Sequence, residues 1–208
     1  MSYFFTVEGM DGVGKTKLIE ELERRLVKKY CFEVYTTKEP TDTPLGEEIR
    51  QNINIYDTEH LSKLFLEDRK NHQKILKEKS KDFEIILCDR YIDSHICYQS
   101  NTYNDIEKLI HLNKDFIQPD KVFLIDSDVD TAIKRINKRE DTSIQKGSIE
   151  YNHLYYELSR VKNNYDFLYK INPNHYYKTQ YNNDTIIDSI LEEMMAIMLH
   201  NKGEIKNG

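Results

Sequence analysis

The sequence has no tryptophan, only three cysteines and no apolar run of membrane-spanning length. The cysteines, Cys31, Cys88 and Cys97, are odd in number and match no zinc-site spacing, so we expect a reduced protein. Cys88 lies in an apolar run, which favours a small core residue over a reactive thiol. The N-terminus lacks a basic segment followed by an apolar one, which argues against a secretion leader. These absences together predict a cytoplasmic protein that does not enter a membrane.

Positively charged residues are also fewer than negatively charged ones. The 30 lysines and arginines are outnumbered by 36 aspartates and glutamates, which gives a formal net charge of −6. Such an acidic balance argues against nucleic acid as a partner, although a local basic patch is compatible with it. Glycine is scarce as well, with seven in the chain. Three of them, Gly9, Gly12 and Gly14, lie in one short stretch that carries the clearest functional signal.

That stretch is a complete phosphate-binding loop signature, Gly9-x4-Gly14-Lys15-Thr16, in the context that the motif requires. β-forming residues 3–7 precede it and a helix-forming run, residues 17–29, follows it. This context disfavours the alternative of a plain glycine turn with a surface lysine. We therefore predict that ATP is bound by Gly9, Met10, Asp11, Gly12, Val13, Gly14, Lys15 and Thr16.

The chemistry of such a loop comes from its backbone and from two side chains. Successive N–H groups can turn toward an anion, and the N-terminus of the following helix adds positive potential. Lys15 is expected to reach the β- and γ-phosphates of ATP. The hydroxyl of Thr16 is expected to bind Mg2+.

Apolar runs of strand length alternate with amphipathic helical stretches along the chain. We expect strands at residues 3–7, 32–37, 83–88, 121–125 and 175–179. We expect helices at residues 17–29, 45–53, 58–79, 92–99, 106–116, 129–139, 148–170 and 186–199, with residues 201–208 frayed. The pattern predicts an α/β fold of the P-loop NTPase type: one domain, residues 1–208, with about five parallel strands and helices on both faces.

Polar residues follow several of the expected strands at the point where each one ends. They are Glu8, Lys38 and Glu39, Asp89 and Arg90, and Asp126. Ligands of parallel α/β sheets gather at the carboxyl ends of the strands. One site centred on the nucleotide phosphates is therefore indicated.

A second constellation narrows the function. The third expected strand is followed by Asp89-Arg90-Tyr91-x2-Ser94-x3-Tyr98-Gln99, the second by Lys38-Glu39-Pro40, and the helix between them carries Phe65-x3-Arg69. Together with Asp11 in the phosphate-binding loop, these elements resemble the thymidylate kinases, which phosphorylate dTMP to dTDP with ATP and Mg2+. The likeness runs from about residue 3 to residue 169, in the family's order and spacing.

The resemblance implies a role for each matching side chain. It makes dTMP the acceptor, bound by Asp11, Glu39, Pro40, Phe65, Arg69, Arg90, Ser94, Tyr98 and Gln99. Phe65 would stack on the thymine ring, and Arg69, one helical turn later, would hydrogen-bond the base O4. Asp11 would bind the 3′-hydroxyl. Arg90 would clamp the acceptor phosphate, for which its planar fork is suited.

The resemblance also implies a metal site, a homodimer and a lid. Asp89 and Thr16 would hold the Mg2+, and Tyr98 would flank the base or exclude a ribose 2′-hydroxyl. The family carries an arginine either in the phosphate-binding loop or in the lid, and this loop has none. A lid at about residues 138–150 would then contribute cations, with Arg135 binding ATP and Arg139 acting in catalysis. The implied catalytic set is Lys15, Asp89, Arg90 and Arg139.

One departure from the family concerns the segment after the second strand. Lys38-Glu39-Pro40-Thr41-Asp42 replaces the more usual Arg-Glu-Pro-Gly-Gly. A lysine at position 38 keeps the positive charge but lacks the planar fork that binds a phosphate through two bonds.

Simpler interpretations compete at several positions. Asp89 and Arg90 fit a strand-end ion pair, Phe65 fits a plain core residue, and the basic run near Arg139 fits a solvated helix end. The histidines form no convincing ligand pair. We expect His60 and His72 at the surface and propose no zinc site.

Two other functions stay open. A kinase for another deoxynucleoside or nucleoside monophosphate would share the phosphate-binding loop. The residues that distinguish a thymidylate kinase from such an enzyme are Asp11, Phe65 and Arg69. A nucleotide-dependent switch should carry Asn-Lys-x-Asp, whose nearest match, residues 137–140, lies on the wrong element. The only Asp-x-x-Gly lies inside the phosphate-binding loop, so a switch is disfavoured.

Overall fold

The computed structural model describes residues 2–180 and 184–205 of the chain. Its strands form one sheet in the order β2-β3-β1-β4-β5, and every neighbouring pair is parallel. The strands are β1 (Tyr3–Glu8), β2 (Val34–Lys38), β3 (Ile85–Asp89), β4 (Lys121–Asp126) and β5 (Tyr176–Gln180). The predicted parallel sheet is therefore confirmed.

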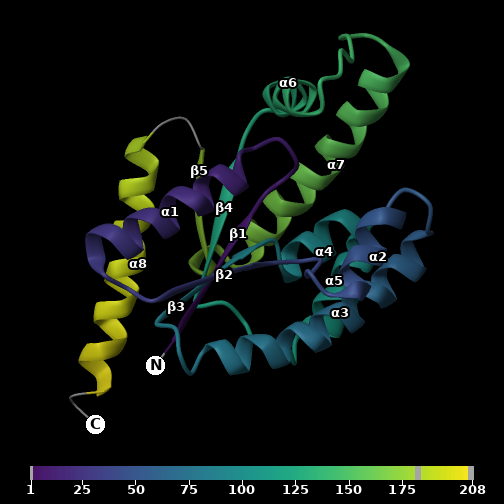
Figure 1. Ribbon diagram of the computed structural model, residues 1–208. Helices are drawn as coiled ribbons and strands as arrows, with labels where there is room; N and C mark the ends of the chain where they lie inside the picture. Colours follow the sequence, from purple (N-terminus) through teal and green to yellow (C-terminus); the bar gives the residue numbers. More distant parts are fainter. Residues whose placement is uncertain (1, 181–183, 206–208) are drawn as a thin grey trace.

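Helices cover both faces of this sheet. They are α1 (Lys15–Tyr30), α2 (Pro44–Asn52), α3 (Thr58–Lys79), α4 (Ile92–Gln99), α5 (Tyr103–Asn113), α6 (Val129–Glu140), α7 (Ile149–Ile171) and α8 (Asp184–Ile205), with a 3-10 turn, η1, at Pro173–His175. Figure 1 shows α1 and α8 on one side of the strands and α3, α4, α5 and α7 on the other. Among the described helices, none is both long and apolar enough to span a membrane.

The core forms where apolar strands meet the apolar stripe of each helix. All six residues of β1 are buried, and so are the first four of β3. Leu18, Leu22 and Leu26 form the buried stripe of α1. Cys88 is buried as predicted, and its thiol donates to the carbonyl oxygen of Arg90 at 3.0 Å.

Several helix ends differ from the predicted ones, and in one case a capping group accounts for the difference. α5 begins at Tyr103 rather than at residue 106, because Thr102 and Asp105 form a capping box. α1 begins at Lys15, directly after Gly14, rather than at residue 17. α8 continues to Ile205, beyond the predicted end at residue 199. Residues 206–208 of the tail expected to be frayed lie outside the described residues.

The register of the sheet brings the predicted strand-end residues together. β3 lies between β1 and β2, with Asp89 opposite Val7 on one side and opposite Lys38 on the other. The loop after β1 therefore lies at the same edge as the residues that follow β2 and β3. This edge carries the candidate site.

Candidate active site

The phosphate-binding loop packs tightly against β4 and α6. Gly9 and Gly12 have φ angles of 141° and 80°, a region that side chains disfavour. A Cβ atom on Gly9 would lie 2.4 Å from the carbonyl oxygen of Ile125. One on Gly12 would lie 2.4 Å from the carbonyl oxygen of Ala132. Glycine is therefore needed at both positions for conformation and for close packing.

Two predicted ATP-binding residues of this loop face the core. The side chains of Met10 and Val13 are 3% and 1% exposed and belong to the main hydrophobic cluster. They can contact a nucleotide only through their backbone atoms. Asp11, Gly12 and Gly14, in contrast, line the cavity above the loop.

Lys15 lies at the start of α1 with its side chain folded back over the loop. Its Nζ donates to the carbonyl oxygens of Gly9 and Met10, both at 3.0 Å. Burial, followed by the nearby charge of Arg90, lowers the pKa of Lys15 to about 8. A phosphate is a stronger acceptor than a carbonyl oxygen, so it can displace these two bonds.

Thr16 and Asp89 meet between α1 and the end of β3. The Thr16 hydroxyl donates to Asp89 Oδ2 at 3.2 Å, while Oδ1 is buried with no hydrogen-bond partner among the described residues. Mg2+ is often bound by one or two protein oxygens together with substrate phosphates and water. A hydroxyl and an unsatisfied carboxylate oxygen beside the loop fit such an ion. The described part of the chain holds no group of three or more acidic, histidine or cysteine ligands.

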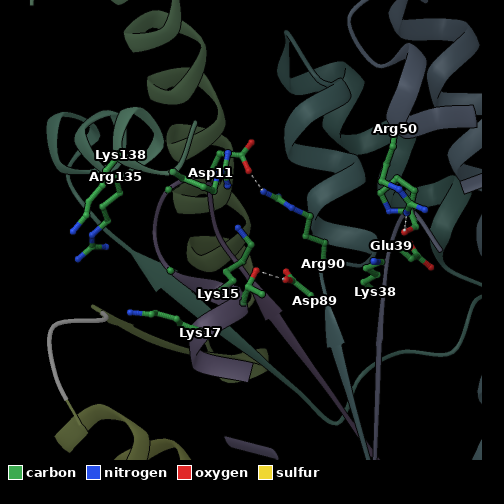
Figure 2. A pocket seen from close by; sticks show the side chains of 15 residues that line it. Asp11, Lys15, Lys17, Lys38, Glu39, Arg50, Asp89, Arg90, Arg135 and Lys138 are labelled. Atoms are coloured by element: carbon green, nitrogen blue, oxygen red, sulfur yellow. Dashed lines mark hydrogen bonds and ion pairs between the residues drawn. The ribbon is translucent and has the colours of Figure 1, made fainter. Parts of the chain in front are cut away.

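A cavity of about 950 Å3 opens above the loop, and Figure 2 shows the side chains that line it. We call it the phosphate cavity; it is lined by Asp11, Gly12, Gly14, Lys15, Thr16, Lys17, Lys38, Glu39, Pro40, Arg50, Asp89, Arg90, Arg135, Lys138 and Arg139. Eight of these residues are lysine or arginine and three are acidic. An excess of cations in one cavity attracts a polyanionic ligand.

A smaller cavity of about 170 Å3 shares part of this lining, and we call it the acceptor cavity. It is lined by Asp11, Glu39, Pro40, Ile53, Phe65, Arg69, Arg90, Tyr91, Ser94, His95, Tyr98 and Gln99. All nine residues that the resemblance implies for dTMP are in this set. The residues common to both cavities are Asp11, Glu39, Pro40 and Arg90.

Arg90 lies at the junction of the two cavities. Its Nη2 donates to Asp11 Oδ1 at 2.5 Å, and its Nη1 donates to Ser94 Oγ at 3.0 Å. The ring of Tyr98 lies 4.9 Å from the guanidinium carbon, and its hydroxyl donates to Asp11 Oδ2 at 3.0 Å. Burial raises the pKa of Asp11, but the charges of Arg90 and Lys15 outweigh it and hold that pKa well below its usual value. The ion pair of Arg90 is thus with Asp11, not with its neighbour Asp89.

Glu8, at the end of β1, fixes the start of α4 relative to the loop. Its carboxylate accepts hydrogen bonds from the backbone N–H of Tyr91 at 2.7 Å and from the Ser94 hydroxyl at 2.6 Å. The hydroxyl of Tyr165 donates to the same carboxylate at 2.9 Å. A negative charge at a helix N-terminus is stabilising. Glu8 therefore connects the loop to the helix that carries the acceptor residues.

Arg69 is fully buried, and all five of its N–H groups have protein partners. Nε and Nη2 pair with Glu39 Oε2, and Nη2 also donates to the Tyr91 carbonyl oxygen at 3.2 Å. Nη1 donates to Asn113 Oδ1 at 2.6 Å and lies 3.1 Å from His95 Nδ1. A bond to the base O4, as the resemblance implies, would require one of these to be shared or exchanged.

His72 corrects the sequence analysis, because it is buried rather than at the surface. Its Nδ1 lies 2.9 Å from Glu39 Oε1, and its Nε2 lies 2.9 Å from Thr37 Oγ1. The apolar stripe of α3 does not reveal that His72 lies on a second, polar face of the helix that is also buried. The hydrogen-bond partners of His72 come from the end of β2, which is distant in the sequence. His60 is exposed, as predicted.

Phe65 combines a packing role with a place in the acceptor cavity. It is 9% exposed and packs with Ile49 and Leu61 in a small cluster between α2 and α3. Its ring stacks on His95, with the centroids 5.4 Å apart and the planes at 26°. The interpretation of Phe65 as a buried core residue is therefore correct. Its stacking on a base stays a prediction.

The cations of α6 reach the phosphate cavity from the far side of the loop. Arg135 Nη1 donates to the carbonyl oxygen of Val13 at 3.0 Å, which ties α6 to the loop. Arg139 lines the cavity and pairs with Glu140 at 2.7 Å. Asp126, expected at the common site, lines neither cavity and instead pairs with Lys162 and Lys178.

Two basic residues of the phosphate cavity were not predicted from the sequence, Lys17 and Arg50. Arg50 lies on α2 and donates to the carbonyl oxygens of Pro40 and Thr41 at 2.6 and 2.8 Å. Neither residue belongs to a motif. Only the packing of α2 against the loop after β2 directs Arg50 to the site.

Comparison with known proteins gives a consistent result. The thymidylate kinase family model matches residues 7–187. A probable thymidylate kinase of Caldivirga maquilingensis is 30% identical, covering 100% of this chain and 98% of the relative. The thymidylate kinase of Staphylococcus epidermidis is 31% identical, over 93% and 95%. The crystal structure of the Ehrlichia chaffeensis thymidylate kinase superposes with a TM-score of 0.69 at 28% identity, over 93% of this chain and 98% of that one.

The family's motif residues thus converge on two adjoining cavities, and the likeness extends over most of the sequence and of the fold. The chain belongs to the thymidylate kinase family.

Proposed function

We propose that the protein transfers the γ-phosphoryl group of ATP to dTMP, giving dTDP. The observation that carries this proposal is the pair of adjoining cavities. One is rich in cations and surrounds Lys15, the other is lined by every residue implied for dTMP, and Arg90 belongs to both. A phosphoryl donor and an acceptor bound in these cavities would meet at Arg90.

The donor side is assigned to the loop and its two polar side chains. The triphosphate lies against the loop N–H groups, and Lys15 exchanges its two carbonyl partners for phosphate oxygens. Thr16 and Asp89 are the residues that would hold Mg2+, which neutralises charge on the β- and γ-phosphate oxygens when bound. Phosphoryl transfer needs positioning and positive charge rather than a covalent intermediate, and this site offers both.

The acceptor phosphate is assigned to Arg90, with Lys38 and Arg50 on the neighbouring wall. Arg90 can bind a phosphate through its fork once its bond to Asp11 is exchanged. Asp11 lines the acceptor cavity and would then be available for the 3′-hydroxyl. Lys38 and Arg50 both contact Asp42, at 2.8 and 3.4 Å, so a phosphate must compete with that carboxylate for them.

Base recognition is assigned first to Gln99 and Phe65. Gln99 lines the acceptor cavity, and its side-chain amide makes no hydrogen bond within the described residues, so this amide can both donate and accept. Thymine presents a donor, N3–H, between two carbonyl acceptors, which an amide can match. Arg69 supports this arrangement by holding Glu39, and its bond to O4 is the secondary contact. The small size of the cavity favours one ring over the two rings of a purine.

The remaining inferences from the family resemblance are part of the same proposal. They are a single domain over residues 1–208, a lid at about residues 138–150 carrying Arg139, a homodimer and a cytoplasmic location. The lid would exclude water and so suppress hydrolysis of ATP. The position of Arg135 and Arg139 along the phosphate cavity supports the lid assignment.

Purified protein offered a panel of acceptors tests the proposal. ADP release and the diphosphate product are measured with ATP, Mg2+ and dTMP, dUMP, dCMP, dGMP, AMP or thymidine. We expect dTMP to have the highest kcat/KM, with dUMP about tenfold lower because it lacks only a methyl group. Lys15→Ala, purified in the same way, controls for a contaminating kinase. A preference for a purine monophosphate or for uncharged thymidine would refute the proposal.

A further inference from the structure

Arg90, at the junction of the two cavities, has an unusual backbone conformation. Its φ angle is 64°, in the left-handed region that residues other than glycine rarely adopt, so its neighbours must hold it there. Its own N–H donates to the carbonyl oxygen of Val7 at 3.1 Å, and the next N–H, that of Tyr91, donates to Glu8 Oε1 at 2.7 Å. The end of β1 thus fixes the backbone from which the Arg90 side chain extends.

The Arg90 guanidinium group has an exposed side and a buried side. On the exposed side, Nη2 pairs with Asp11, whose side chain is 43% exposed, and Figure 2 shows these two side chains directed at one another. On the buried side, Nη1 donates to Ser94 Oγ at 3.0 Å and to the carbonyl oxygen of Gly9 at 3.3 Å. A phosphate that enters the cavity can therefore replace Asp11 while the bond to Ser94 stays in place.

The Ser94 hydroxyl connects this buried side to the carboxylate of Glu8. A guanidinium group only donates, so Ser94 Oγ accepts from Arg90 and has one hydrogen to give elsewhere. That hydrogen goes to Glu8 Oε2 at 2.6 Å. The Tyr165 hydroxyl, from α7, donates to the same Oε2 at 2.9 Å and lies 2.9 Å from Ser94 Oγ. One buried carboxylate thus holds both the backbone beside Arg90 and the hydroxyl that orients its side chain.

Capping of α4 does not by itself account for Glu8. The N-cap of a helix is ordinarily satisfied by a local serine, threonine, aspartate or asparagine. The N-cap of α4 is Tyr91, which makes no side-chain cap, and the carboxylate comes from a strand 83 positions earlier in the chain. Glu8 and Tyr165 line neither described cavity, so they reach a ligand only through the residues that they hold.

We infer that Glu8, held by Tyr165, is a positioning residue that directs the Arg90 guanidinium group at the phosphate of the acceptor. The role rests on the proposed function, which assigns that phosphate to Arg90. Its mark is selectivity. Loss of the hydrogen bonds around Glu8 weakens the contact to the acceptor phosphate, whereas the contacts to the nucleoside stay.

Calorimetry with dTMP and with thymidine, both without ATP, tests this role. Tyr165→Phe keeps the ring and removes one hydrogen bond to Glu8. We expect its affinity for dTMP to fall about fivefold and its affinity for thymidine to change less than about twofold. Tyr3→Phe is the matched control, because it also removes a buried tyrosine hydroxyl, one that donates to the Met198 carbonyl oxygen at 3.1 Å. Tyr3 lines neither described cavity, so both affinities should change less than about twofold.

Glu8→Gln tests the carboxylate itself. The glutamine can keep an acceptor for the Tyr91 N–H, but it presents an amide N–H2 group in place of the Oε2 that receives the Ser94 hydroxyl. We expect about tenfold weaker dTMP binding, with thymidine binding changed less than about twofold. Because Glu8 acts through Arg90, the same change in an Arg90→Ala background should weaken dTMP binding less than about twofold. If Glu8→Gln does not fold, Tyr165→Phe decides alone.

Equal losses for dTMP and thymidine in Tyr165→Phe would overturn the inference, and so would a Tyr165→Phe result equal to that of Tyr3→Phe. A Glu8→Gln loss that persists without Arg90 would do the same. Any of these results in a protein that phosphorylates dTMP removes the positioning role alone. A wild-type protein that binds dTMP no more tightly than thymidine would instead remove the proposed function, and the positioning role with it.

Discussion

Lys15 and Arg69 are both buried cations, but they are held in different ways. Among the described residues, the Lys15 ammonium group has only two carbonyl oxygens as hydrogen-bond partners, and it can exchange them for the oxygens of a ligand. Arg69 is paired with the Glu39 carboxylate and uses every donor it has. Removing one partner of such a buried pair costs about 3–5 kcal/mol, which marks Arg69 as part of the scaffold. For a single residue, the sequence indicates the residue type and the motif it belongs to, but not how many of its hydrogen-bond donors are available to a ligand.

The lowered pKa of Lys15 leads to a prediction at alkaline pH. With a pKa of about 8 in the free protein, Lys15 loses its charge as pH rises through that value. Since kcat/KM for ATP reports the form of the enzyme that has not yet bound ATP, its value at saturating dTMP should fall above an apparent pKa near 8. Bound triphosphate keeps the lysine protonated. The control is therefore kcat/KM for dTMP at saturating ATP, which should not fall as pH rises through about 8. A profile for ATP that stays flat to about pH 9.5 would contradict the assignment.

Helices α3 and α4 show what an element adds to a motif. Phe65 and Arg69 were predicted to lie on one face of α3, and they line one cavity. The same helix also buries Asp68, whose carboxylate accepts from the Thr41 backbone N–H at 2.8 Å, and His72. Hydrophobic periodicity could not reveal this polar face, because its burial depends on partners distant in the chain. The missed role of Arg50 on α2 has the same cause.

The buried carboxyl of Asp93 on α4 predicts a pH-dependent stability. Its Oδ2 has no partner among the described residues, and burial followed by the charge of Glu8 raises its pKa to about 7. Tyr176 and Arg69 partly oppose that rise. An unfolded aspartate titrates near pH 4, so this group favours the folded state below that value and loses the contribution as pH rises through about 7.

Asp93→Asn removes that titration while retaining an acceptor for Tyr176. The difference in unfolding free energy between variant and wild type should therefore grow in favour of the variant from about pH 4 to pH 7, by an amount on the order of 3 kcal/mol. Urea denaturation at a series of pH values measures it. A difference that stays constant across this range would show that Asp93 does not titrate there.

For the whole molecule, alternation of strands and helices was enough to predict the parallel sheet, and the family motifs identified which residues meet at its edge. The five strands and the convergence of all nine acceptor residues on one cavity follow from those two signals. The extent of the phosphate cavity could not be predicted, because Lys17 and Arg50 reach it from elements that carry no motif. Asp126 shows that a strand-end position alone does not predict a site residue. It lies at the end of β4 as expected, but its carboxylate forms ion pairs with two lysines outside the site.

The central claim is that one continuous site binds a triphosphate and a thymidine monophosphate end to end. A bisubstrate ligand, adenosine joined to thymidine through a chain of five phosphates, tests it most directly by calorimetry. We predict a 1:1 complex that is tighter than the complex of either substrate alone, because joining two ligands makes the second contact intramolecular. The ligand should compete with both ATP and dTMP. Binding no tighter than ATP alone, or displacement by only one of the two substrates, would contradict the account.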